Sequence, residues 1–291
     1  MSSFLALFKS DFDIIEDYFT DGFWSKLFNE LSVSSKSNGS CINFKQITEK
    51  IHEAYKGAGL PKKKGYPDNK KLLIAIQQLC NHRVFLKGFL FKCIICSSEF
   101  WYSLEELGSN LVCKGCLANF PFPIEPRFVY KLNDLVKRNL FQSPGTVSGN
   151  LTVIRTLGYL KKAWYSPFQS LNSFVFSPQL ELYLNSTDKN SCSDLDLVCI
   201  TRGKLVVGEA KNCSEGFSKY DYKSIKTLFD AAIRIKPDIL ILSCSIDKGN
   251  QLSAAKDRLV NLLAEKEVHI HVEAILLPPD EFSEFVARRY E

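Results

Sequence analysis

The chain has 291 residues, of which 45% are hydrophobic and 12% aromatic, and a formal net charge of +5 at pH 7. This length suffices for two or three domains, and the composition is that of folded modules rather than of a disordered chain. No apolar run approaches the roughly 20 residues that a membrane-spanning helix needs. These features predict a cytoplasmic protein with no membrane partner.

The N-terminal part of the chain is predicted to be mostly helical. Residues 4–31 form an acidic, Phe-rich segment, and the Ser/Asn/Gly stretch over residues 32–40 reads as a linker. Amphipathic helices are predicted near residues 44–55 and 69–81, followed by a strand over residues 83–91. A helix, a basic loop, a second helix and a strand in this order resemble a winged-helix arrangement.

Positive charge is concentrated in the same part of the chain. Residues 42–92 hold eleven Lys and Arg against three Asp and Glu, a net charge of +8. Such a patch attracts phosphate backbones without reading base sequence, so we expect it to bind nucleic acid. A solvated, solubilising loop is the alternative. The candidate nucleic-acid-binding residues are Lys62, Lys63, Lys64, Lys70 and Lys71.

Four cysteines have the spacing of a zinc site. Two C-x-x-C pairs, Cys93 with Cys96 and Cys113 with Cys116, are separated by sixteen residues. This spacing is typical of a four-cysteine zinc ribbon, in which one structural Zn²⁺ folds the module. Gly115 suits a knuckle turn that needs a positive φ. A pair of disulfides is the competing interpretation.

Aromatic residues cluster around the predicted zinc site. They are predicted to form a small metal-dependent core, and stacking on nucleic-acid bases is the alternative. The residues concerned are Phe91, Phe100, Trp101, Tyr102, Phe120 and Phe122.

Three prolines end the predicted ribbon, and the apolar residues over 128–140 follow helical spacing. Beyond them the pattern predicts a helix at 151–164, a strand at 173–184 and a hairpin at 194–211. A helix at 219–235, a strand at 238–243, a helix at 251–266 and a strand at 268–277 then follow. The predicted domains are residues 1–87 (helical, basic), 88–126 (zinc ribbon) and 127–291 (α/β).

The hairpin carries the most informative pattern of the chain. Asp194 and Asp196 alternate with apolar residues on the first strand, and Glu209 and Lys211 lie two apart on the second. Side chains two apart on a strand share a face, so carboxylates and an ammonium are expected to meet beside a hydrophobic hairpin. Unpaired charge there is costly, and a metal ion would explain the arrangement.

Asp196, followed thirteen residues later by Glu209-Ala210-Lys211, resembles the D…(D/E)xK signature of the PD-(D/E)XK, or restriction-endonuclease-like, nuclease superfamily. The order αβββαβ around the hairpin is that of the superfamily's core. The resemblance implies a mixed sheet flanked by helices, with Asp196 and Glu209 as ligands of Mg²⁺ or Mn²⁺. It also implies that Lys211 places the attacking water and that the Ala210 carbonyl is a further ligand.

One departure concerns the third acid. Many members supply a Glu from the first helix of the fold, and residues 151–164 contain no acid. Asp194 or Glu181 is then the candidate substitute. A catalytically inactive nuclease fold, acting as a zinc-ribbon nucleic-acid-binding or scaffold subunit, is the alternative function.

The function expected from these features is that of a metal-dependent nuclease hydrolysing DNA phosphodiester bonds. Relatives with zinc ribbons imply a role in restriction, antiviral defence against phage or mobile-element processing. The expected partners are nucleic acid, above all DNA, and a regulatory or complex-forming protein; a homodimer is left open.

Overall fold

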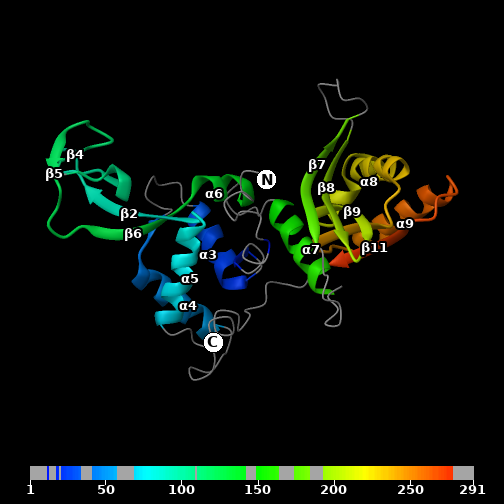
Figure 1. The fold of residues 1–291 in the computed structure, drawn as a ribbon, viewed down its shortest axis with the longest axis horizontal. Coiled ribbons are helices and arrows are strands. Elements are labelled where there is room, and N and C mark those ends of the chain that lie inside the picture. Colours follow the sequence, from blue (N-terminus) through cyan, green and yellow to red (C-terminus); the bar gives the residue numbers. More distant parts are fainter. Residues whose placement is uncertain are drawn as a thin grey trace. The chain divides into compact units, whose positions relative to one another are not determined.

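A computed structural model describes residues 12, 18–19, 21–33, 41–57, 69–108, 110–141, 149–163, 174–183 and 193–277. The chain divides into two compact units, one built around residues 3–146 and the other around residues 147–280 (Figure 1). Each unit is a mixture of helices and β-sheet. Within the described residues, no helix combines the length and the apolar character needed to cross a membrane.

Among the described residues from 21 onward, the first unit has three helices before β2 (Phe85–Lys92), and two of them begin at side-chain caps. The Asp21 carboxylate accepts the backbone N–H groups of Phe23 and Trp24, both at 3.0 Å, at the start of α3. Asn43 and Gln46 exchange side chain–backbone hydrogen bonds of 2.8 and 2.9 Å at the start of α4, which is a capping box. The helices are α3 (Gly22–Val33), α4 (Phe44–Gly57) and α5 (Asn69–Asn81).

A four-stranded antiparallel sheet completes this unit. Its strand order is β1-β6-β2-β3, so the first strand pairs with the last. The strands are β1 (Cys41–Ile42), β2 (Phe85–Lys92), β3 (Glu99–Ser103) and β6 (Arg127–Leu132). The prediction of a helix over residues 128–140 is therefore wrong for its first half. Residues 127–132 form β6, and only α6 (Asp134–Leu140) is helical.

The zinc-ribbon segment lies between β2 and β6. It contains β3, the 3₁₀ turn η2 (Leu104–Glu106) and the hairpin of β4 (Asn110–Val112) with β5 (Asn119–Pro121). Its small core is aromatic, because Phe91, Tyr102 and Phe120 are each at most 3% exposed. For these three residues the prediction that the aromatic rings form a small core is confirmed.

The domain boundaries differ from those predicted. β6 pairs with β2 over Leu90↔Arg127 to Phe85↔Leu132, and β6 and α6 both belong to the first unit. The boundary expected at residue 127 therefore moves to about residue 147. The expected ribbon also shares β2 with the helical region, so the two belong to one unit rather than two.

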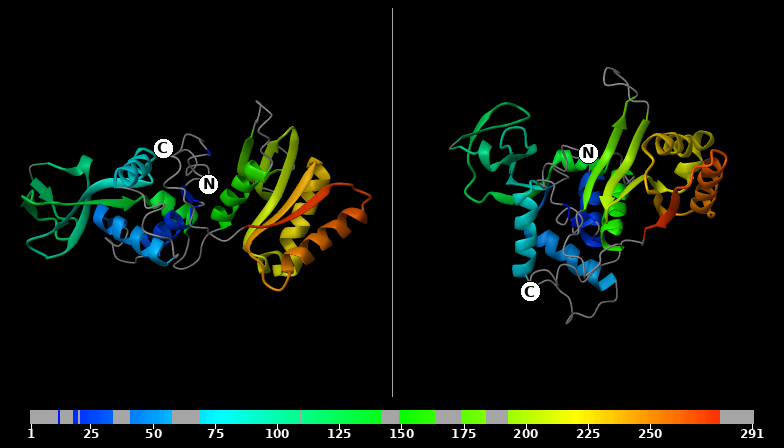
Figure 2. Two further views of the ribbon diagram at one scale, coloured as in Figure 1. Left: turned by 90° about the horizontal axis from the view of Figure 1, so that it is seen from below. Right: turned by 45° about the vertical axis from the view of Figure 1, so that its right-hand side comes forward.

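The second unit is built on a five-stranded mixed sheet of order β11-β10-β9-β8-β7 (Figure 2). β7, β8 and β9 form an antiparallel meander, and β9, β10 and β11 run parallel. The strands are β7 (Val175–Leu182), β8 (Ser193–Thr201), β9 (Lys204–Cys213), β10 (Ile239–Ile246) and β11 (His271–Leu276).

Helices cover both faces of this sheet. On β10, Leu242 and Cys244 join the buried core cluster formed with α8 (Glu215–Ile235) and α9 (Gln251–Ala264). Ser243 lies between them on the strand, and its Oγ is 2.7 Å from Oγ1 of Thr156 on α7 (Gly149–Ala163). Because successive residues of a strand point to opposite faces, α7 packs on one face and α8 and α9 on the other.

Candidate metal centre on the β8–β9 hairpin

The hairpin predicted from the sequence is present. β8 and β9 pair antiparallel from Leu197↔Gly208 to Thr201↔Lys204, joined by Arg202 and Gly203. Both connecting residues have positive φ, 51° and 71°, as a two-residue type I′ turn requires. Leu195 and Leu197 are fully buried, so the expected apolar side of β8 lies in the core.

Three of the predicted site residues lie together. The Asp196 carboxylate accepts the Ala210 backbone N–H at 3.0 Å and the Lys211 Nζ at 3.2 Å, both through Oδ2. Lys211 Nζ also forms an ion pair with Glu209 Oε1. Neighbouring strands thus bring two carboxylates to one ammonium group.

The site lies on the face of the sheet that α8 covers. Val207, Glu209 and Lys211 alternate along β9 and share a face, and Val207 belongs to the core cluster with α8. Gly216, in the first turn of α8, lies against the stem of Lys211: a Cβ there would be 3.1 Å from Lys211 Cγ. Gly216 is a site residue that the sequence pattern alone did not indicate.

Burial shifts the protonation equilibria within this group. Glu209 is only 8% exposed, and burial together with the Asp196 carboxylate raises the pKa of Glu209 to about 8, although Lys211 opposes the rise. Burial lowers the pKa of Lys211, but Glu209 and Asp196 more than offset this, and its pKa is raised overall. At neutral pH without a metal, Glu209 therefore keeps its proton, and a divalent cation would displace that proton and bind both carboxylates.

The two candidates for a third acid, Asp194 and Glu181, do not lie with Asp196 and Glu209. Asp194 and Glu181 lie opposite each other on β8 and β7, and both are exposed. The Glu181 carboxylate accepts a 2.6 Å hydrogen bond from the Tyr183 hydroxyl. Within the described residues, neither joins Asp196 and Glu209 in a group of three possible ligands within 4.8 Å. The described helix α7 contains no acid, as the sequence indicated.

The Ala210 carbonyl faces a different neighbour. Ala210 is 2% exposed and gives its N–H to Asp196, while a Cβ on Gly149 of α7 would lie 3.9 Å from the Ala210 oxygen. Its role as a metal ligand stays a prediction.

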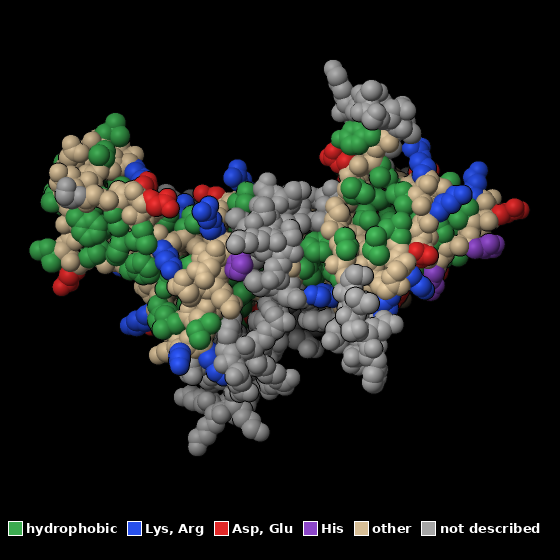
Figure 3. Space-filling model, in the orientation of Figure 1, with side chains coloured by type: hydrophobic (Ala, Val, Ile, Leu, Met, Phe, Trp, Pro, Cys, Tyr) green, Lys and Arg blue, Asp and Glu red, His purple; other side chains and the backbone are tan. Residues whose placement is uncertain are grey.

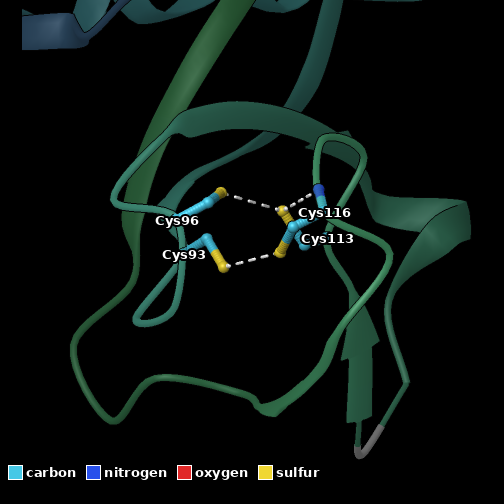
Figure 4. A group of neighbouring side chains, drawn as sticks. All are labelled: Cys93, Cys96, Cys113 and Cys116. Carbon is cyan, nitrogen blue, oxygen red and sulfur yellow. Dashed lines mark hydrogen bonds between the residues drawn. The ribbon is translucent and has the colours of Figure 1, made fainter.

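The four predicted zinc ligands form one cluster (Figure 4). The Sγ atoms of Cys93 and Cys116 are 3.7 Å apart, those of Cys96 and Cys113 are 3.6 Å apart, and all four lie within 4.8 Å of one another. A tetrahedral zinc with Zn–S bonds of about 2.3 Å requires sulfur–sulfur distances of about 3.8 Å. The cluster therefore fits a structural Zn²⁺.

The two knuckles have the same backbone pattern. Cys93 N–H donates to Ser98 O at 2.8 Å, and Cys113 N–H donates to Ala118 O at 2.9 Å. The left-handed residues are Ser97 (φ 58°) and Leu117 (φ 60°), so the expectation of a positive φ at Gly115 is wrong.

Gly115 is instead required by packing. A Cβ at this position would lie 2.8 Å from the ring of Phe100. The knuckle and the aromatic core therefore meet at this glycine.

Backbone donors prepare the thiols unequally for a metal. The Ser98 backbone lowers the pKa of Cys96 to about 6, and the Cys116 N–H lowers the pKa of Cys113. Cys116 accepts a lowering hydrogen bond from Ala118, but desolvation and the neighbouring thiols raise its pKa to about 11. A metal ion is what would hold all four as thiolates together.

The predicted basic patch is described only in part. Lys70 and Lys71 lie in the first turn of α5, where Lys70 is exposed. Lys62, Lys63 and Lys64 lie outside the described residues.

Comparison of the chain with protein-family models, with curated proteins and with solved structures gave no match.

Proposed function

We propose that this protein is a metal-dependent nuclease that hydrolyses DNA phosphodiester bonds. The observation that carries the proposal is the meeting of Asp196, Glu209 and Lys211 on neighbouring strands, with Glu209 almost buried. A buried Glu209 beside a partly buried Asp196 and one lysine suits phosphate chemistry better than it suits a structural ion pair. Without a metal the second acid is held protonated, since burial and Asp196 raise the pKa of Glu209 to about 8, and a metal ion would take the place of that proton.

The order of elements supports a restriction-endonuclease-like fold for the second unit. α7, β7, β8, β9, α8 and β10 follow one another as αβββαβ, and α9 and β11 extend the sheet. The acids lie on the second and third strands of this order, where the resemblance requires them.

The donor set fits a hard divalent cation. Mg²⁺ commonly takes one or two protein carboxylates and completes its shell with water and substrate oxygens, which suits a site with two carboxylates. When bound, such an ion activates a water and neutralises charge on the phosphate. Asp196 and Glu209 would hold the ion, and the Ala210 N–H fixes the Asp196 carboxylate. Lys211 would orient the attacking water and offset charge on the phosphate oxygens.

We further propose a winged-helix arrangement for the first unit. Its helices and strands follow the order α3-β1-α4-α5-β2-β6, and β6 pairs between β1 and β2. The zinc ribbon would then stand where a wing loop connects the last two strands. Together with the basic α5, this unit would position the DNA or a partner protein.

A second candidate function is that of an inactive nuclease fold serving as a nucleic-acid-binding or scaffold subunit. One observation favours it: within the described residues, no third acid lies at ligand distance from both Asp196 and Glu209. Such a site would hold its metal less tightly.

The deciding experiment is cleavage of supercoiled plasmid, linear duplex and single strands with Mg²⁺, Mn²⁺ or EDTA. Wild-type protein should cleave in a metal-dependent manner, and Glu209→Gln should lose at least about 100- to 1,000-fold in rate while still binding DNA. Metal-dependent cleavage that persists in Glu209→Gln would place the active site elsewhere. Metal-dependent binding without cleavage would favour the second candidate.

A further inference from the structure

An exposed tyrosine lies between two lysines in the N-terminal part of α8. Tyr220 is 86% exposed, although a tyrosine ring is a large and mostly apolar group. Lys219 and Lys223 are also exposed. A large aromatic ring left in water has no role in the core of this unit.

This segment begins at the candidate metal centre. Gly216 lies against the side chain of Lys211, where an added Cβ would approach the stem carbons to between 3.1 and 3.3 Å. Tyr220 follows Gly216 by four residues, so their Cα atoms are at most about 15 Å apart; Gly216 faces Lys211, whereas the ring of Tyr220 is exposed. A nucleotide held at Tyr220 would therefore lie within a few nucleotides of Lys211 along a bound strand.

The backbone at this place is unusual. Tyr220 and Tyr222 have φ values of 52° and 58°, in the left-handed region that residues with a Cβ disfavour. Tyr222 is partly buried, packs against the core cluster and has Arg258 over its ring at 4.9 Å. Tyr220, two residues earlier, is directed to solvent. The distortion thus accompanies one tyrosine in the core and one on the surface.

Residues 219–223 hold two lysines and one acid, Asp221, and this net charge of +1 favours an anionic ligand. Glu215 is engaged with Lys248 at 3.4 Å, whereas Lys219 and Lys223 are exposed on the same helix. Figure 3 shows hydrophobic side chains over the middle of the second unit and Lys and Arg side chains toward its right edge, together with Asp, Glu and His. An exposed aromatic ring with lysines nearby in the chain is a combination with which proteins hold unpaired nucleotides, because every base has a stacking face and every nucleotide a phosphate.

We propose that Tyr220, with Lys219 and Lys223, binds an unpaired nucleotide beside the Asp196–Glu209–Lys211 centre. The ring stacks on a base, and the lysines contact the flanking phosphates. The proposal rests on the proposed function and adds a substrate class, since bases within a duplex have no free face: single-stranded DNA or an unpaired end. A protein partner docking on Tyr220 is the other outcome of the test.

The test measures binding in the Glu209→Gln background with Mg²⁺ present, using a fluorescent oligothymidylate and a duplex of equal length. Tyr220→Ala should weaken binding of the single strand by roughly five- to a hundredfold, as expected for the loss of one base–aromatic stack. Tyr220→Phe should bind the single strand as well as the parent protein does, because the ring and not the hydroxyl stacks on the base. Tyr159→Ala on α7, a half-exposed tyrosine of the same unit, should change nothing.

A second readout is quenching of 2-aminopurine placed in the oligonucleotide. The quenching should appear with the parent protein and with Tyr220→Phe, and it should be absent with Tyr220→Ala. Equal binding by Tyr220→Ala and the parent would overturn the inference, as would equal losses for duplex and single strand, which would indicate backbone or protein contacts alone. If wild-type protein fails to cleave but Tyr220 still carries single-strand binding, the proposed function fails and this inference stands.

Discussion

Gly216 at the start of α8 lies directly against Lys211 on β9, and a Cβ at residue 216 would approach Lys211 Cγ, Cβ and Cδ to between 3.1 and 3.3 Å. The stem of the lysine is thereby confined between the sheet and the helix. Its ammonium group contacts the carboxylates of Asp196 and Glu209.

The first prediction follows from this contact. Gly216→Ala should lower kcat by about tenfold with little change in KM, since small displacements of a catalytic group are costly. In a Lys211→Ala background the same substitution should have no further effect, because the residue it displaces is gone. Gly149→Ala, whose Cβ would have an ordinary 3.9 Å contact, is the matched control. Additive losses in the two backgrounds would show that Gly216 acts only on the fold.

A second prediction concerns Asp194. This residue is exposed on β8, and its carboxylate contributes to the raised pKa of Glu209 without joining the pair as a ligand group. Asp194→Asn should keep cleavage within about threefold of wild type, as for an ordinary surface substitution. Asp196→Asn should abolish it. Complete loss in Asp194→Asn would identify Asp194 as the acid that the first helix of the fold lacks.

The third prediction is that each chain binds one zinc through the ribbon. Cys113→Ser should lose the metal and unfold the ribbon, because structural zinc contributes on the order of 10 kcal/mol to folding such modules. The second unit should keep its own unfolding transition, which calorimetry and metal analysis together would reveal. Cys213→Ser, in a residue outside the cluster, is the control. Protein purified without chelators that contains no zinc would contradict this.

Alkaline pH provides the fourth prediction. Burial raises the pKa of Cys199 to about 12 from an ordinary 9.0. Below about pH 9 the thiol is protonated in both the folded and the unfolded state, so it does not change the free energy of unfolding with pH. As the pH rises from about 9 toward 12, the unfolded thiol ionises and the folded one does not, and the free energy of unfolding falls. It should fall more steeply in wild type than in Cys199→Ala. The free energy of unfolding can be measured by urea titration at several pH values; an equal fall with pH in wild type and Cys199→Ala would contradict the prediction.

The basic patch gives the fifth prediction. Replacing Lys62, Lys63, Lys64, Lys70 and Lys71 by Gln should weaken binding to all DNA sequences alike. The slope of log affinity against log salt should shrink by about 0.9 for each phosphate that the protein no longer neutralises. Lys204→Gln with Lys236→Gln, two exposed lysines of the second unit outside residues 42–92, is the comparison. An unchanged slope of log affinity against log salt would indicate that these lysines only make the loop soluble.

The hairpin and the zinc cluster could be predicted because their signals are local. Alternation and a two-residue turn define β8 and β9, and cysteine spacing defines the knuckles. The strand at residues 127–132 could not be predicted because it pairs with β2 across the whole ribbon, and such long-range pairing overrides the helical spacing of Phe128 and Leu132.

Contacts between elements could not be predicted in the same way. Gly216 meets Lys211 only because α8 starts at Glu215, four residues before the start that the apolar pattern predicts. The left-handed φ of Ser97 and Leu117 likewise depends on hydrogen bonds that close each knuckle, and neither residue type suggests it.

The register Leu90↔Arg127 means that the chain between these two residues starts and ends at neighbouring points of the first unit's sheet. Part of this stretch stays in the sheet, because β3 pairs with β2 from Gly88↔Ser103 to Lys92↔Glu99. The segment from η2 to β5 lies outside that sheet. A change of length in this segment should therefore leave the pairing of β2 with β3 and β6 in place.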